Sequence, residues 1–266
     1  MIEVRASLAF ARTRVWEVGC ASFFLLCSCD ARVVLGERQT TNPPPPVVDG
    51  GGGEGGSVDP GPVEPVGEIL WSSTSEAGDF SEWEGDGAAT GGLYSWASGE
   101  SIVTTERAHS GTHSIRCSID TDEVSPGDTS HGARLYRRAS DDVAYYGAWF
   151  WLDAAHVASE WWSIFLFTTH AVPGELDGSQ NLWELRLVDD AGALGLGFYD
   201  HGTGSLTPIA LGHAVPVGAW FHVELRLDPT SASPSASLWF DGDSVLSNIQ
   251  LTPPASDFLY WVLGDR

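Results

Sequence analysis

The chain has 266 residues, with 36 acidic side chains against 13 basic ones and a formal net charge of −23, and every basic residue is Arg. A protein this acidic repels phosphate backbones and anionic lipid surfaces, because non-specific affinity for either depends on neutralising phosphates with Lys or Arg. These numbers exclude nucleic acid as an expected partner and are typical of a soluble extracellular surface.

Residues 1–29 have the layout of an export signal. Three Arg residues precede an apolar stretch at 18–26, which is too short to span a bilayer as a helix. The sequence Leu26-Cys27-Ser28-Cys29 resembles the bacterial lipobox, with an apolar residue three positions before a Cys and a small residue directly before it. We expect a lipid on Cys29 and a secreted, envelope-anchored protein that touches a membrane only through that lipid. A plain secretory signal and a mis-assigned start codon stay open, because acidic residues are unusual in such a segment.

Residues 30–66 are expected to form a disordered linker. They contain the runs Pro43–Pro46 and Gly50–Gly53, and such a composition does not build a packed core. The linker would hold a folded domain, residues 67–266, at some distance from the membrane.

Export processing would leave one cysteine, Cys117, in the mature domain. In the segment from His113 to Ile119, period-2 alternation places Ile115, Cys117 and Ile119 on one strand face. We therefore predict that Cys117 is a core residue, and no disulfide is needed.

From Leu70 onward, short runs rich in β-branched and aromatic residues alternate with clusters of Gly, Pro, Asp and Ser, and helical periodicity is absent. Tight reversals are expected at Ser110-Gly111, Asp190-Ala191-Gly192 and Asp241-Gly242, where positive-φ residues are available. The pattern predicts an all-β fold, a two-sheet antiparallel sandwich. The predicted strands are 69–72, 101–104, 113–119, 133–137, 145–152, 162–168, 182–188, 194–199, 220–227, 237–240 and 259–263.

Five segments carry a family resemblance: Glu76–Trp83, Ala108–Ile115, Tyr146–Leu152, Trp220–Leu225 and Ala236–Gly242. In this order they are similar to motifs of the concanavalin A-like lectin and glucanase superfamily, including laminin G-like and polysaccharide lyase-like domains. The resemblance implies a jelly-roll sandwich in which a concave sheet binds glycans. Fold does not settle function in such a superfamily.

The resemblance also raises a question about the last strand. Related domains usually continue past a strand like Trp261-Val262-Leu263-Gly264 into one more strand that closes a sheet. Either the domain lacks that final strand, or its first strand completes the sheet differently.

Candidate ligand-binding residues follow from strand alternation, which assigns faces. Several strands oppose an apolar face with one that carries aromatic and charged residues, and such a surface suits sugars, which stack on flat rings and hydrogen-bond to acids and Arg. The open alternatives are that the Trp residues belong to the core, that the acid and Arg pair is solvated, and that His222 is structural. The ligand-binding candidates are Trp149, Trp151, Glu184, Arg186, Glu224 and Trp239.

The sequence also bears on catalysis. A retaining glycosidase needs two carboxylates about 5 Å apart, and the E-x-D-x-x-E strand that supplies them in related enzymes is absent. A polysaccharide lyase needs a base and a group that neutralises a uronate carboxylate. Tyr136, His222, Arg134 and Arg186 have that chemistry, although the "R-x-E-L" and "Q-I-H" motifs of alginate lyases are missing. Nucleotide-binding and zinc-enzyme motifs are absent too.

No cofactor is required by this reading, but a structural Ca²⁺ is a candidate, held by Glu76 or Asp79 in an acidic loop. A plain acidic turn is the alternative. The sequence thus predicts extracellular recognition of a polysaccharide by a lectin-like domain. A lyase that cleaves a uronate-containing glycan by β-elimination is the first alternative, and a structural adhesion module with a protein partner is the second.

Overall fold

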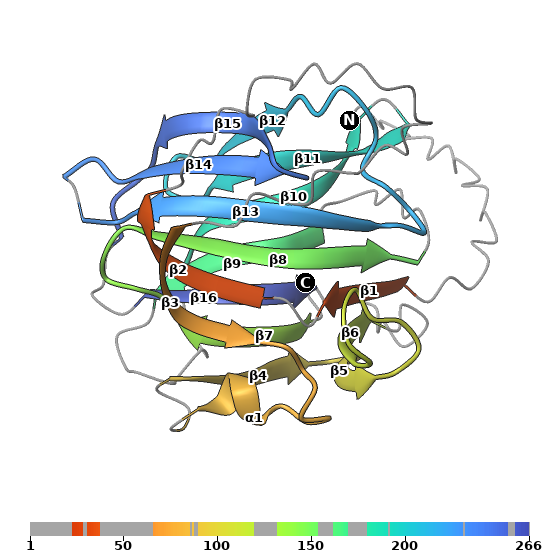
Figure 1. The fold of residues 1–266 in the computed structure, drawn as a ribbon. Helices are drawn as coiled ribbons and strands as arrows, with labels where there is room; N and C mark the ends of the chain where they lie inside the picture. The colour runs from red at the N-terminus through yellow and green to blue at the C-terminus, as the bar shows by residue number, and fades with distance from the viewer. Residues whose placement is uncertain are drawn as a thin grey trace, which may run out of the picture.

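The computed structural model is a sandwich of two antiparallel β-sheets, A and B (Figure 1), which confirms the predicted fold class. The structure describes residues 23–28, 31–37, 66–85, 87, 90–119, 132–153, 162–169, 180–190, 192–230, 232–254 and 259–265. Within these residues, no helix has the length and apolar character needed to cross a membrane.

Sheet A follows the order β15-β14-β13-β8-β1-β6-β5, with β2 paired to both β8 and β3. Its strands are β1 (Phe23–Ser28), β2 (Ala31–Glu37), β3 (Val66–Ser73), β5 (Gly99–Thr104), β6 (Ser114–Ile119), β8 (Ala144–Leu152), β13 (Trp220–Asp228), β14 (Ser235–Phe240) and β15 (Asp243–Gln250).

Sheet B follows the order β12-β11-β10-β9-β16-β7-β4. Its strands are β4 (Gly91–Trp96), β7 (Gly132–Arg138), β9 (Trp162–Thr169), β10 (Gln180–Asp190), β11 (Ala193–Asp200), β12 (Ser205–Ile209) and β16 (Leu259–Asp265). One short helix, α1 (Ser81–Glu84), lies near β4 (Figure 1).

All of the predicted strands are present, with ends shifted by a few residues. The sequence analysis missed β4, β12 and β15 because none has the alternating apolar pattern of a half-buried strand. β4 starts with two Gly residues, β12 contains Pro208, and β15 is mostly polar. β12 and β15 end their sheets, where a strand needs no continuous apolar face.

The N-terminal strands β1 and β2 lie in ranges that the sequence analysis assigns to the export signal and the linker. β1 pairs with β6 on one side and β8 on the other, while β2 pairs with β8 and β3. Cys29 and the Pro- and Gly-rich runs lie outside the described residues, so lipidation and most of the linker stay predictions. Sheet A thus gains additional strands from the N-terminal side of the chain.

The core lies between the sheets and is built from alternate residues of nearly every strand. Its largest buried side chains include Trp183, Trp261 and Phe150. Cys117 is fully buried in the same core as Ile115 and Ile119, which confirms the prediction for that strand.

The predicted reversals have the expected backbone. Gly111 and Gly192 adopt φ values of 64° and 91°, and Asp241 and Gly242 adopt 48° and 88°. These left-handed conformations are the ones that glycine and aspartate tolerate best.

Candidate functional site

The predicted site residues fall into two groups on opposite outer faces of the sandwich. Tyr146, Phe150 and their alternate neighbours in β8 face the core, so Trp149 and Trp151 project outward from sheet A. In β10 the core takes Trp183, Leu185 and Leu187, and the residues between them project outward from sheet B. The outward residues of sheet A include Trp149, Trp151, His222, Glu224 and Trp239, and those of sheet B include Arg134, Tyr136, Glu184 and Arg186.

The predicted lyase set therefore does not converge. His222 lies on the outer face of sheet A, across the whole core from Arg134, Tyr136 and Arg186. Alternation along one strand assigns a face correctly, but it does not say which sheet the strand joins.

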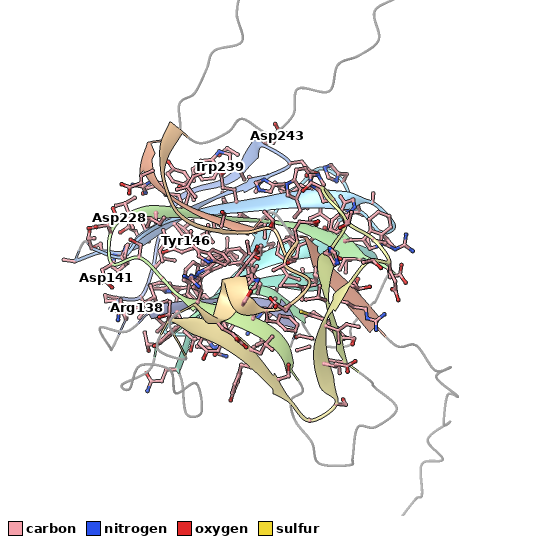
Figure 2. The ribbon with its side chains drawn as sticks, turned by 60° about the horizontal axis from the view of Figure 1, so that its bottom comes forward. Arg138, Asp141, Tyr146, Asp228, Trp239 and Asp243 are labelled. Atoms are coloured by element: carbon pink, nitrogen blue, oxygen red, sulfur yellow. The ribbon has the colours of Figure 1, made fainter. Side chains whose placement is uncertain are left out.

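On sheet A, half-buried rings project outward from three neighbouring strands, β8, β13 and β14, and are here called the aromatic face: Trp149, Trp151, Trp220, His222 and Trp239. β13 runs antiparallel to β8 so that Trp220 opposes Trp151 and His222 opposes Trp149. The ring centroids of these pairs are 5.6 and 5.0 Å apart. Figure 2 labels Trp239, on the outer side of sheet A, and the core residue Tyr146.

The loop between β5 and β6 covers one end of the aromatic face. His109 stacks on Trp149 with a centroid separation of 3.7 Å and an interplanar angle of 16°. The Arg107 guanidinium lies 4.7 Å from the Trp151 ring centroid. These contacts hold the two Trp rings in place and cover one face of each.

A buried carboxylate lies beside the aromatic face. Glu224 opposes Gly147 in β8 and Trp239 in β14, and its side chain is largely buried. A Cβ atom at position 147 would come within 3.1 Å of the His222 ring, so a larger residue there would press on the ring. The face therefore combines flat apolar rings with an acceptor group.

The outer face of sheet B holds a second site, here called the charged cluster: Glu184, Arg186 and His201. One oxygen of Glu184, Oε2, accepts hydrogen bonds from Arg186 Nε at 2.9 Å and Nη2 at 2.7 Å. The same oxygen lies 2.8 Å from His201 Nε2. The Glu184 side chain is 0 % exposed, whereas His201 is 25 % exposed, so the carboxylate is buried beneath an accessible imidazole.

The electrostatics of the charged cluster favour an ionised Glu184. Burial alone would raise the pKa of this carboxyl, but the hydrogen bond from His201 and the charge of Arg186 lower it below the ordinary value. The Arg186 guanidinium also lies 3.7 Å from the Tyr199 ring centroid. The second oxygen of Glu184, Oε1, is buried and receives no hydrogen bond from the described part of the chain.

His201 is held firmly by its surroundings. Its backbone N–H donates to Leu182 O at 2.8 Å, and the preceding Asp200 carboxylate accepts hydrogen bonds from Gly202 and Thr252. The Glu184 contact at Nε2 leaves Nδ1 as the nitrogen that can exchange a proton. A carboxylate that orients a histidine in this way is the arrangement by which enzymes position a general base.

Tyr136 and Arg134 lie on the same outer face but apart from the charged cluster. Tyr136 opposes Val262, Val262 opposes Leu166, and Leu166 opposes Glu184, so three strand spacings, about 14 Å, separate them. Tyr136 is 5 % exposed and packs with Leu166, Val262 and Tyr260. Burial and the neighbouring Tyr260 raise the pKa of the Tyr136 phenol, so the phenol is protonated at neutral pH.

The calcium candidates act as backbone anchors. Glu76 accepts hydrogen bonds from the backbone N–H groups of Thr112 and His113, both at 2.8 Å, and these bonds lower the pKa of its carboxyl to about 2. Asp79 accepts from the backbone and hydroxyl of Ser81 at the start of α1. Among the described residues, no three metal-ligating side chains lie together. The Ca²⁺ site stays a prediction that these contacts do not favour.

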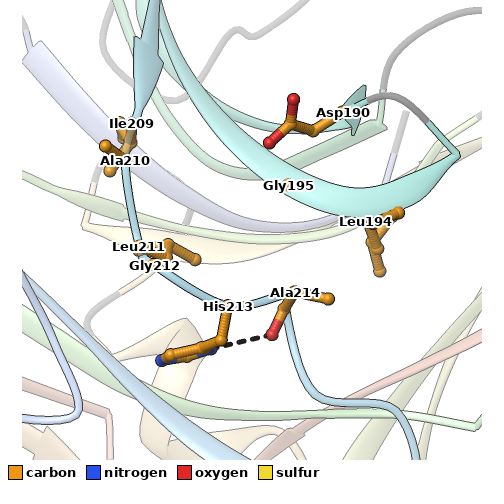
Figure 3. Close-up of a pocket in the computed structure, with 10 residues that line it drawn as sticks. Asp190, Leu194, Gly195, Ile209, Ala210, Leu211, Gly212, His213 and Ala214 are labelled. Carbon is orange, nitrogen blue, oxygen red and sulfur yellow. Dashed lines mark hydrogen bonds between the residues drawn. The ribbon is translucent and has the colours of Figure 1, made fainter.

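A cavity of about 330 Å³ lies between the β10–β11 turn and the segment after β12 (Figure 3). Its walls are mostly small and apolar residues, with Asp190 and His213 as the polar side chains, and His213 Nδ1 bonds to the carbonyl of Ala214 at 2.9 Å. None of the predicted site residues lines it, so the cavity contributes nothing to either outer face.

Three residues of these sites were missed from the sequence. Trp220 opens a predicted strand, and its alternation with His222 was enough to place it on the aromatic face. His109 and His201 lie in loops, where periodicity gives no signal, and only the folded chain brings them to their partners. Comparison with known proteins returns no matching family model, no matching curated protein and no matching solved structure, so function must be argued from this geometry.

Proposed function

We propose that the protein binds an extracellular polysaccharide through the aromatic face of sheet A. The observation that carries the proposal is a patch of half-buried rings on the adjoining strands β8 and β13: Trp149, Trp151, Trp220 and His222. A core tryptophan would be buried, as Trp183 and Trp261 are, whereas these rings reach the surface.

The chemistry of the aromatic face suits a sugar chain. The C–H faces of a pyranose ring pack on indole rings, and hydroxyl groups need nearby acceptors such as the Glu224 carboxylate. The rings of β8 and β13 form a compact patch of two opposed pairs, which offers apolar surface to a sugar unit.

A glycan array and calorimetric titration with the full chain test the proposal. Trp149→Ala and Trp220→Ala are expected to weaken binding roughly tenfold each, since buried aromatic contacts typically contribute one to a few kcal/mol at an interface. Leu206→Ala, an exposed substitution on sheet B, is the control and should leave affinity unchanged. Absence of binding to every polysaccharide, or equal affinity of all three variants, would rule the proposal out.

A second candidate function, a polysaccharide lyase, is favoured by the charged cluster. In β-elimination a base removes the proton beside a uronate carboxylate, the bond from the neighbouring carbon to the glycosidic oxygen breaks, and a proton is returned to that oxygen. His201 has the position of the base, since Glu184 orients its ring. The Arg186 charge is paired with Glu184 in the cluster, so a lyase would need a further group to neutralise the uronate carboxylate.

The lyase candidate has a direct readout, the ultraviolet absorbance of the unsaturated uronate product. His201→Ala should abolish product formation, while His222→Ala, on the opposite face, should leave it intact. A chain that gives no such absorbance on alginate, glucuronan or heparin-like substrates is no lyase of this type. Loss of activity in His222→Ala but not in His201→Ala would assign the base to the other face.

A further inference from the structure

In sheet A, the strands other than β1 leave a gap, one strand wide, between β8 and β6. Before β1 is considered, β6 pairs only with β5. β8 pairs with β13 along one side, and on its other side β2 reaches only residues 144–147, which leaves Phe150–Leu152 without a partner. β1 fills the space between them and pairs antiparallel with both: Leu25 opposes Cys117 in β6 and Leu152 in β8. Figure 1 shows β1 between β8 and β6.

This position needs an occupant for two physical reasons. Without a strand there, the facing backbone N–H and C=O groups of β6 and of Phe150–Leu152 would lose their ladder partners beside a dry core. The residues of β6 that face the core, Ile115, Cys117 and Ile119, would also lie at an open edge, and such an edge pairs with other chains. A strand that is apolar at its core-facing register positions would satisfy both needs.

The sequence of β1 matches that requirement by register. Residues directly opposite in an antiparallel pair belong to the same face of the sheet. The core-facing Ile119, Cys117 and Ile115 are opposed by positions 23, 25 and 27, which are Phe, Leu and Cys. Leu26, one residue along, opposes Arg116 and Trp151, both of which face outward.

We propose that the space between β8 and β6 is a strand-binding slot and that Phe23–Ser28 is its resident occupant. The apolar segment that resembles an export signal is then a structural strand of the folded domain. The two roles exclude each other in one molecule, because processing at Cys29 would remove β1 and open the slot. Retention of the segment therefore follows from the proposal.

A disulfide trap tests the register in the full-length chain. Opposed residues in an antiparallel pair have Cα atoms about 4.5–5.5 Å apart, which a disulfide can bridge. Leu25→Cys should cross-link to the native Cys117 on oxidation, and peptide mapping by mass spectrometry would identify the link. Leu26→Cys is the matched control and should give no link to Cys117, because it belongs to the opposite face. Failure of Leu25→Cys to link, or equal linking by both variants, would overturn the proposal.

A second pair of variants separates the structural role from export. Leu25→Glu and Leu26→Glu add the same charge to the same apolar stretch, so they disturb an export signal equally. Leu25→Glu should lower the melting temperature by roughly 10 °C and release the amides of β6 to hydrogen exchange, because it places a charge at a core register position. Leu26→Glu, opposite Arg116, should cause neither effect.

The N-terminus of protein purified from the producing cells completes the test. Recovery of a folded chain that still contains residues 23–28 supports the proposal. A folded chain that begins at Cys29, with the amides of Ser114–Ile119 as slow to exchange as in the unprocessed chain, overturns it, since the slot would then not need β1.

Discussion

Replacing Glu184 by Ala should destabilise the domain more than most single substitutions. The side chain is fully buried, and its Oε2 atom is bonded to both Arg186 and His201. Its removal leaves the Arg186 guanidinium, 7 % exposed, without its charge partner. Breaking a buried ion pair from one side costs about 3–5 kcal/mol, because the remaining charge stays desolvated and unpaired.

The size of the effect can be checked by urea unfolding followed by tryptophan fluorescence, and by thermal unfolding. For a domain of this size, a loss of about 3–5 kcal/mol corresponds to a fall in melting temperature of about 6–20 °C. The double variant Glu184→Leu/Arg186→Leu removes both charges and keeps apolar volume, so it should be markedly more stable than Glu184→Ala. A loss below about 1 kcal/mol for Glu184→Ala, or a double variant less stable than the single one, would refute the assignment of a buried, coupled pair.

Three further outcomes are expected. Hydrogen bonds lower the pKa of the Glu76 carboxyl to about 2, from the 4.5 that it would have without them. The contribution of Glu76 to stability is therefore fully present above pH 4.5 and is lost as the pH falls through 2. The difference in unfolding midpoint between wild type and Glu76→Gln should therefore shrink over that range. Tyr146→Phe removes the hydroxyl that accepts the Ser140 amide at 2.9 Å and should cost about 1–2 kcal/mol in denaturant unfolding. Gly91→Ala would place a methyl group against the carbonyl oxygens of Trp83 and Tyr136, and calorimetry should find a lower melting temperature than for the wild type.

The sequence was sufficient to find the strands that carry an alternating apolar face. Ile115, Cys117 and Ile119 are a clear case, because a strand packed on one side against a core must be apolar at every second position. Strands at the sheet ends, such as β12 and β15, escaped because solvent reaches most of their side chains.

The candidate sites also contain residues that alternation along one strand could place and contacts that it could not. Alternation placed Trp149, Trp151, Glu184 and Arg186 on outward faces correctly, since that is a property of one strand. It could not pair Glu184 with His201, because the bond depends on how the turn after β11 is held against β10.

The sequence by itself determined the all-β class, the reversals at positive-φ residues and the identity of the core positions, because these depend on local backbone chemistry and on period-2 burial. Tertiary structure alone decided which strands share a sheet. That choice sent His222 and Arg186 to opposite faces and brought Phe23–Ser28 between β8 and β6, because strand pairing joins residues far apart in the chain and leaves no local trace in the sequence.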